Sequence, residues 1–235
     1  MKVIALYTVL FISFSISAQN KFQQSETTFG NGDSIVYLKS TMNPINGIIV
    51  FSDNVRIEGR REISFKNGKY DGVNSWWSSN GQLISQINFS NGKRNGSSKS
   101  WHLNGRLKEE AYYKNDILNG IRKYFYDNGQ ICYEENYLNG LKHLKNKCWY
   151  ENGQLMWEEN YINGQRNGLQ VHWYENGLLS SKINCKNGLR NGTCITWYDN
   201  GNKRFEGEFK LGIEINLNCW DQTGKIINCD YLSNE

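Results

Sequence analysis

Proline and histidine are scarce in this sequence, with one proline and three histidines among 235 residues. The histidines, His102, His143 and His172, fall in three different repeats of the array described below, so they cannot share a metal or serve one nucleophile. Phosphate-binding loops, HExxH motifs and GxSxG elbows are also lacking. We therefore predict no catalytic residues, no metal site and no cofactor, and we do not expect an enzyme.

Neither sign of charge is in large excess. The chain has 27 Lys and Arg residues against 23 Asp and Glu residues, a formal net charge of +4 that is spread along its length. So mild a balance does not predict a nucleic-acid partner. Aromatic residues make up 14% of the chain, which supplies enough apolar surface to argue against disorder.

Long apolar runs are confined to the N-terminus. Lys2 precedes an apolar run of about 14 residues, and Ala18 would be the last residue before cleavage, which is the layout of a secretory signal peptide. The run is short for a membrane span, and an N-terminal anchor helix is the alternative. We predict that residues 1–18 are removed and that the protein is exported to the periplasm, the cell envelope or the outside. The mature chain carries no strong membrane signal.

The cysteines are Cys132, Cys148, Cys185, Cys194, Cys219 and Cys229. An even number in an exported chain permits up to three disulfides. No CxxC pair is present, which argues against zinc. Cys219 and Cys229 flank the turn-like segment DQTG, so we predict a disulfide between them. Free buried cysteines are the alternative.

What the sequence does contain is a strict period of 24 residues. An aromatic residue or cysteine recurs at this interval without insertion, at Phe65, Phe89, Tyr113, Tyr137, Tyr161, Cys185 and Phe209. With each of these taken as position 1, Asn-Gly recurs at positions 3–4 and 16–17, and eleven of the twelve expected pairs are present. Such self-similarity is the signature of a repeat array.

Each repeat is predicted to be one β-hairpin, because Asn and Gly tolerate the positive φ of tight turns. The second turn, around positions 15 to 17, should be compact. The first turn should be a wider loop with positive-φ residues at both ends, because a further glycine follows at position 8. Leu144 replaces that glycine in one repeat, and we expect a local distortion there.

Alternation within the second strand places apolar residues on one face. We predict that three columns share that face: the aromatics of position 1, the leucines of position 19, and the aromatic column of position 13. The last consists of Trp77, Trp101, Phe125, Trp149, Trp173 and Trp197. Equivalent side chains of neighbouring repeats can then stack into a continuous core.

A tyrosine stripe occupies position 14 on the opposite face, at Tyr126, Tyr150, Tyr174 and Tyr198. Two interpretations are open. The tyrosines can be structural and pack across strands, or they can form a binding strip, since aromatic residues in a line suit proteins or sugar rings.

We predict an all-β fold: one solenoid-like domain formed by an elongated, twisted antiparallel sheet of successive hairpins. Residues 19–64 are expected to form an N-terminal cap with a degenerate repeat, residues 65–208 six complete repeats, and residues 209–235 a partial C-terminal repeat.

The unit Gly-x4-Trp-Tyr-x-Asn-Gly-x-Leu-x5-Tyr-x-Asn-Gly resembles the MORN-repeat variant of bacterial proteins, most clearly at 149–164 and 168–188. The resemblance extends over residues 65–227 and implies an elongated sheet of hairpins. Eukaryotic MORN repeats are associated with membrane or phospholipid contact and with scaffolding, and some bacterial variants are antitoxin-like. Position 22 is mostly glutamate and gives no recurring basic stripe for lipid.

Two functions follow as hypotheses. The first is a non-catalytic exported repeat protein that binds a protein partner, as a scaffold or as an antitoxin- or immunity-like factor. The second is a glycan- or cell-wall-binding module that uses the tyrosine stripe.

Overall fold

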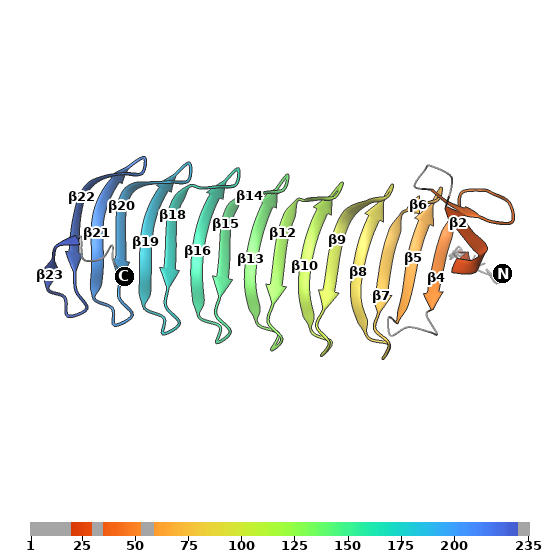
Figure 1. The fold of residues 1–235 in the computed structure, drawn as a ribbon, viewed down its shortest axis with the longest axis horizontal. Coiled ribbons are helices and arrows are strands. Elements are labelled where there is room, and N and C mark those ends of the chain that lie inside the picture. Colours follow the sequence, from red (N-terminus) through yellow and green to blue (C-terminus); the bar gives the residue numbers. More distant parts are fainter. Residues whose placement is uncertain (1–19, 30–34, 53–58, 230–235) are drawn as a thin grey trace, which may run out of the picture.

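The computed structural model describes residues 20–29, 35–52 and 59–229. The predicted signal peptide, residues 1–18, lies outside them, as do residues 53–58 of the degenerate repeat and the last six residues of the chain. The described residues form one 21-stranded sheet and a separate two-stranded sheet. Figure 1 shows the long strands side by side in one row, with the N-terminal segment at one end. The predicted all-β sheet of successive antiparallel hairpins is confirmed.

The N-terminal segment precedes the row. It consists of β1 (Lys21–Gln23), the 3-10 turn η1 (Gln24–Glu26), β2 (Thr27–Phe29) and β3 (Val36–Leu38). β1 pairs in parallel with β4 (Gly47–Ser52), whereas β2 and β3 pair only with each other as strands and form an arm.

The long strands follow in chain order. They are β5 (Arg60–Lys66), β7 (Gly72–Trp77), β8 (Leu83–Ser90), β9 (Lys93–Trp101), β10 (Leu107–Lys114), β12 (Gly120–Phe125), β13 (Ile131–Leu138), β15 (Leu144–Trp149), β16 (Leu155–Ile162), β18 (Gly168–Trp173), β19 (Leu179–Lys186), β20 (Leu189–Trp197), β21 (Lys203–Lys210) and β22 (Ile213–Trp220). Five two-residue strands complete the sheet: β6 (Lys69–Tyr70), β11 (Ile117–Leu118), β14 (Leu141–Lys142), β17 (Gln165–Arg166) and β23 (Ile226–Ile227).

The first turn of each repeat is tighter than the sequence suggested. Lys66 pairs with Lys69, and the two residues between them, Asn67 and Gly68, have φ values of 49° and 71°. This is a two-residue hairpin turn with positive φ at both central positions. The predicted wide loop is therefore wrong. The extra residues lie instead in a bulge at the start of the next strand, where Gly72 has a φ of 96°.

Buried amide side chains at position 10 complete this bulge. A bulge leaves a main-chain amide without its ladder partner. Asn74 Oδ1 accepts a hydrogen bond from Ser64 N at 2.8 Å, and Gln170 Oε1 accepts one from Asn160 N at 3.1 Å. Both side chains are almost fully buried. In these repeats the buried amide side chain thus serves the bulge, whereas Cys194 occupies the same position one repeat after Gln170.

The second turn is compact, as predicted. Ser78 N donates to Gln82 O at 2.8 Å, Gly81 N donates to Ser78 O at 2.9 Å, and Gly81 has a φ of 85°. This is the common three-residue hairpin loop, in which a left-handed glycine follows a tight turn.

The predicted columns do not all share one face. In β7 and β8, Gly72 pairs with Phe89 and Trp76 with Ser85, so these residues lie on the face that carries the position-1 aromatics, here called the aromatic face. Trp77 follows Trp76 and points to the other side, here called the indole face. Trp77 pairs with Leu83 across a second bulge, which brings position 19 to the indole face as well.

The prediction of three columns on one face is therefore wrong: positions 13 and 19 share the indole face, and position 1 lies opposite. Contacts between lysine ammonium groups and aromatic rings agree with this division. Lys142 lies 5.4 Å from the ring centre of Tyr161 on the aromatic face, whereas Lys203 lies 5.6 Å from that of Trp220 on the indole face. The sequence could not reveal this, because antiparallel register pairs even positions of the first strand with odd positions of the second.

The buried apolar core lies under the N-terminal arm. Val36, Ile45 and Ile49 pack with Ile63 and Phe65 on the aromatic face of β5. At the other end of the row, Cys219 and Cys229 are joined by a disulfide with a Cα separation of 5.2 Å, which is the pair that the sequence favours.

Leu144 does not distort its repeat, contrary to expectation. It adopts a φ of 58° and pairs with Tyr161 just as Gly168 pairs with Cys185 one repeat later. A leucine held in left-handed backbone carries strain of about 1–2 kcal/mol.

We predict that Leu144→Gly raises the free energy of unfolding by about 1 kcal/mol, because glycine relieves this strain and the leucine side chain is 63% exposed. Denaturant unfolding measures the change. Leu169→Gly is the matched control, since Leu169 is also exposed but has no positive φ, and it should lower stability. Equal losses in both variants would contradict the strain.

Candidate binding surfaces

The tyrosine stripe connects consecutive repeats. Three hydroxyls donate to the main-chain carbonyl of the position-13 residue in the next repeat: Tyr126 to Trp149 at 2.7 Å, Tyr150 to Trp173 at 3.0 Å and Tyr174 to Trp197 at 2.7 Å. Tyr198 donates to Trp220, one position earlier in the last repeat, at 2.9 Å. His102 makes the same contact with Phe125 through Nε2, at 2.9 Å. The structural interpretation of the stripe accounts for all of these contacts.

The asparagine of the second turn forms a parallel ladder. Asn152 Oδ1 accepts from Gln154 N within its own turn at 2.8 Å, and its Nδ2 donates to Glu175 O of the next turn at 3.3 Å. Asn104, Asn128, Asn176 and Asn200 repeat the second contact. The repeated asparagine therefore closes one turn and holds the next.

Glutamates of position 22 form ion pairs on the indole face. Glu110 pairs with Lys99 at 3.0 Å, and Glu134 pairs with Lys123 at 3.1 Å. Pairs this accessible to solvent contribute roughly 0–1 kcal/mol each. They form a solvated charged surface.

A buried carboxylate on the aromatic face was not recognised from the sequence. The Glu159 side chain is 5% exposed and contacts Arg166 Nη2 at 2.7 Å, His172 Nε2 at 3.1 Å and the Tyr161 hydroxyl. Burial alone would raise its pKa, but the hydrogen bonds from His172 and Tyr161 and the charge of Arg166 outweigh burial and lower the pKa to about 2.

Glu135 has an equivalent environment one repeat earlier. It contacts Lys142 at 2.7 Å and the Tyr137 hydroxyl at 3.0 Å. The signal in the sequence was a glutamate two residues before a position-1 tyrosine, with a basic residue five positions after that tyrosine. A carboxylate as strongly paired as Glu159 is a poor proton donor or acceptor near neutral pH, and we assign it a structural role.

The free cysteines that titrate abnormally are shielded. Burial raises the pKa of the Cys148 thiol to about 11, and it also raises the pKa of Cys185 and Cys194. Thiols in this state are poor nucleophiles. Across residues 20–29, 35–52 and 59–229, no three His, Cys, Asp or Glu side chains gather so that they could hold a metal. Nor does any helix in this part of the chain have the length and apolar character needed to cross a membrane.

The charges of the array are separated between its two edges. The first turns form the upper edge in Figure 1 and the second turns the lower one. Positions 2 to 9, here called the basic edge, carry eleven cations: Lys66, Lys69, Lys93, Arg94, Lys114, Lys142, Lys145, Arg166, Lys186, Arg190 and Lys210. Only three carboxylates accompany them, those of Asp71, Asp116 and Glu214.

The second turns, which are positions 14 to 18 and the equivalent residues 221–225 of the last repeat, form a short acidic edge. Its carboxylates are Asp127, Glu151, Glu175, Asp199 and Asp221, against the two cations Arg106 and Lys225. The small net charge of the whole chain conceals this separation, which the sequence analysis missed. A count of charges by repeat position could have found it.

Exposed aliphatic side chains accompany the basic edge. Ile117, Leu138, Leu141, Ile162 and Leu189 are each between 44% and 50% exposed and come from consecutive first turns. Leu141 packs beside Gly164 of the next turn. A Cβ added to Gly164 would lie 3.5 Å from Leu141 Cδ2. The aliphatic side chains thus recur along this edge, in a row that Gln165 interrupts where it takes the place of Leu141 one repeat later.

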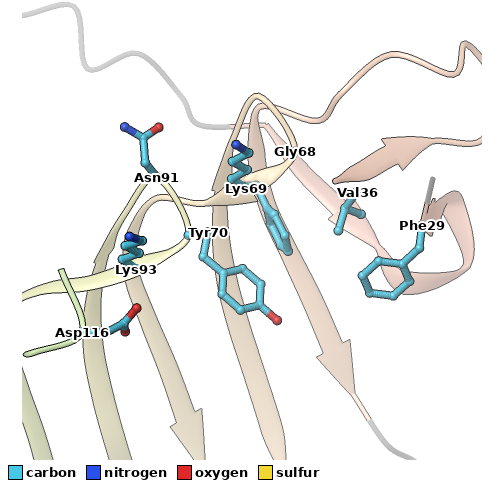
Figure 2. Close-up of a pocket in the computed structure, with 10 residues that line it drawn as sticks. Phe29, Val36, Gly68, Lys69, Tyr70, Asn91, Lys93 and Asp116 are labelled. Carbon is cyan, nitrogen blue, oxygen red and sulfur yellow. The ribbon is translucent and has the colours of Figure 1, made fainter. Parts of the chain in front are cut away.

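A groove separates the N-terminal arm from the first repeats. One hollow of about 700 Å³ is lined by Phe29, Val36, Phe65 and Tyr70, with Lys69, Lys93 and Asp116 among its further lining residues. Figure 2 shows the rings of Phe29 and Tyr70 on opposite sides of the hollow and Lys69 and Lys93 at its rim. This is a second candidate surface, distinct from the aliphatic row of the central repeats.

We predict that Tyr150→Phe lowers the free energy of unfolding by about 1 kcal/mol, because Trp173 O loses its hydroxyl donor while the ring is retained. Tyr112→Phe is the control, since Tyr112 is 43% exposed and its hydroxyl lies 3.4 Å from Glu110. Thermal or denaturant unfolding of both variants decides. If the two variants lose the same free energy of unfolding, the hydroxyl contacts of the tyrosine stripe do not contribute to stability.

Glu159 should make the free energy of unfolding depend on pH. Its folded-state pKa of about 2 lies below the ordinary value of 4.5, so its stabilisation is present above about pH 4.5 and is lost as the pH falls toward 2. We expect Glu159→Gln to be less stable than the native chain at pH 6, with the difference shrinking below pH 4.5 in denaturant titrations. Glu158→Gln, on the indole face, should show much less of either effect. A difference for Glu159→Gln that does not change with pH would contradict the assignment.

Comparison with known families supports the repeat assignment. The model of the MORN repeat variant matches residues 70–91, 94–115, 118–139, 142–163 and 190–211. The unit between the last two segments, in which Cys185 replaces the aromatic residue, is not matched, although β18 and β19 pair like their neighbours. No curated protein matches the chain. MORN repeats commonly mediate protein or membrane-lipid contacts and are generally non-catalytic. Over these segments the chain is a MORN-repeat array and belongs to the MORN repeat variant family.

Proposed function

We propose that this protein is a non-catalytic scaffold that binds a protein partner with an acidic surface along the basic edge. The observation that carries the proposal is the coincidence of two features on one edge. Most of the array's exposed large aliphatic side chains lie in positions 2 to 9, the same positions that carry eleven cations against three carboxylates. Four of these cations, Arg94, Lys142, Lys145 and Arg166, form ion pairs, and the others form none with a described residue.

Exposed aliphatic side chains in a row are typical of a protein contact. Contiguous apolar surface rimmed by polar groups marks interaction sites on soluble proteins. Here Leu138 and Leu141 pair across one turn, and Ile162 pairs with Gln165 across the next. Repeats follow one another at roughly 10 Å, the width of two strands, so a partner can meet the same chemistry several times.

The charges of the basic edge orient the partner and raise the rate of its association. Cations around an apolar contact attract an acidic partner over a distance and favour one docking geometry. The carboxylates of the acidic edge repel the same partner, which disfavours binding in the reverse orientation.

The tyrosine stripe gives less support to a glycan partner. Its hydroxyl hydrogens already bond carbonyls of the next repeat, so the tyrosines have no hydroxyl donor left for a sugar. An exported scaffold of the periplasm or cell envelope and an antitoxin- or immunity-like factor are both forms of the proposed protein binding. Export itself depends on the predicted removal of residues 1–18.

Site-specific photo-crosslinking in the producing cells tests the proposal. A crosslinker in place of Leu141 should capture a discrete acidic protein that mass spectrometry identifies. The matched control replaces Leu103, which is 83% exposed on the acidic edge and should not capture it. Capture from both edges alike, or of no discrete protein, would contradict the proposal.

With the captured protein purified, Leu141→Glu with Ile162→Glu should weaken binding by at least about tenfold, because two apolar contacts become repulsive charges. Leu103→Glu should leave the affinity unchanged. Binding should also weaken as salt rises, since screening reduces the attraction between the basic edge and the partner. Calorimetry at two salt concentrations measures both effects.

A further inference from the structure

We propose that the groove under the N-terminal arm is a binding site for a small amphipathic carboxylate, an apolar chain or ring that ends in one anionic group. The groove lies at one end of the array, where β2 and β3 face the aromatic face of β5 and β6. It is separate from the aliphatic row of the central repeats, and the inference does not depend on the proposed protein partner.

Two adjoining hollows form this groove. Their volumes are about 700 and 590 Å³, and both are lined by Phe29, Val36, Phe65 and Tyr70. Ligand pockets for small molecules span roughly 300–1,000 Å³. The shared walls make one elongated groove, which continues toward Ile49 and Phe51 on β4.

The floor of the groove and the walls that Phe29 and Tyr70 form are apolar, whereas Gln24, Ser25, Thr27, Thr28 and Lys39 also line the second hollow. Val36 and Phe65 are 5% exposed and form a closed floor. Tyr70 packs edge-on against Phe65, with ring centres 5.1 Å apart, and against Phe89 at 5.3 Å. Phe29 faces them from the arm and is 73% exposed. A large aromatic side chain left open across from an aromatic wall is the arrangement that an inserted apolar group would cover.

Main-chain contacts hold the arm in place. Val36 N donates to Gly68 O at 2.9 Å, and Gly68 N donates to Ile45 O at 2.8 Å. The approach is so close that a Cβ on Gly68 would lie 2.2 Å from Ile35 Cγ2. The groove is therefore preformed by the fold, which reduces the entropy lost when a ligand binds.

One end of the groove carries two lysines, whereas Lys39, which lines the second hollow, donates to the main-chain oxygen of Ser25 at 2.9 Å. Lys69 and Lys93 lie at the rim, and neither forms a salt bridge with another described residue. The nearby carboxylate of Asp116 is instead bonded by Arg94, through the main-chain amide at 2.9 Å and Nε at 3.2 Å. Two ammonium groups beside an apolar groove complement a ligand whose anionic head lies at Lys69 and Lys93 and whose tail runs toward Phe51.

Titration calorimetry on the full chain tests this inference with decanoate and decyltrimethylammonium below the concentrations at which they form micelles, and with decanol below its solubility limit. Decanoate should bind with one-to-one stoichiometry and more tightly than the other two. Phe29→Ala should weaken decanoate binding about tenfold, because the tail loses one aromatic wall. Lys69→Glu with Lys93→Glu should abolish the preference for decanoate over decyltrimethylammonium.

The controls separate groove binding from general attraction to the basic edge. Lys114→Glu with Lys186→Glu changes the same net charge on that edge outside the groove and should leave decanoate binding unchanged. All substituted residues are exposed, so circular dichroism should match the native chain. No decanoate binding, equal binding of the cationic and anionic probes, or equal losses in the two lysine pairs would each overturn the proposal. None of these outcomes affects the photo-crosslinking test at Leu141, which concerns the proposed protein partner.

Discussion

The structure depends on hydrogen bonds that pass from one repeat to the next at the turns. A single-layer sheet leaves most side chains half-buried, so burial alone holds it weakly. The hydroxyl of Tyr150 and the amide of Asn152 both reach carbonyls of the following repeat, and at the other edge Gly164 N donates to Lys142 O. Because the repeats from His102 onward contribute equivalent donors at the second turns, the array is tied at both edges of the sheet.

The same regularity separates positive and negative charges between the two edges of the sheet. In a strict repeat, any bias at one sequence position becomes a line of like groups in space. Cations at positions such as those of Arg166 and Arg190 gather at the first turns, whereas carboxylates such as that of Glu175 gather at the second turns. A chain of nearly balanced charge thus acquires one basic, aliphatic edge and one acidic edge, and a scaffold can use that difference to orient a partner.

The two ends of the array are closed by additional elements. An open sheet must protect its terminal strands. At the N-terminal end β1 pairs with β4 and the arm covers Phe65, which creates the only extensive apolar core among the described residues and leaves the groove beside Phe29. At the C-terminal end β23 and the Cys219–Cys229 disulfide close the row. The groove is therefore a consequence of capping, and its chemistry comes from side chains of the cap and the first repeats.

The sequence alone determined the period, the number of hairpins and the compact second turn, because these follow from local backbone requirements such as the positive φ of Gly81. It could not place Trp77 and Phe89 on opposite faces, because register and two bulges per repeat decide that parity. It also could not tell that the Tyr150 hydroxyl reaches the next repeat, that Glu159 is buried among its partners, or that Phe29 and Tyr70 face each other. Those relations join residues distant in the chain, and only tertiary structure brings them together.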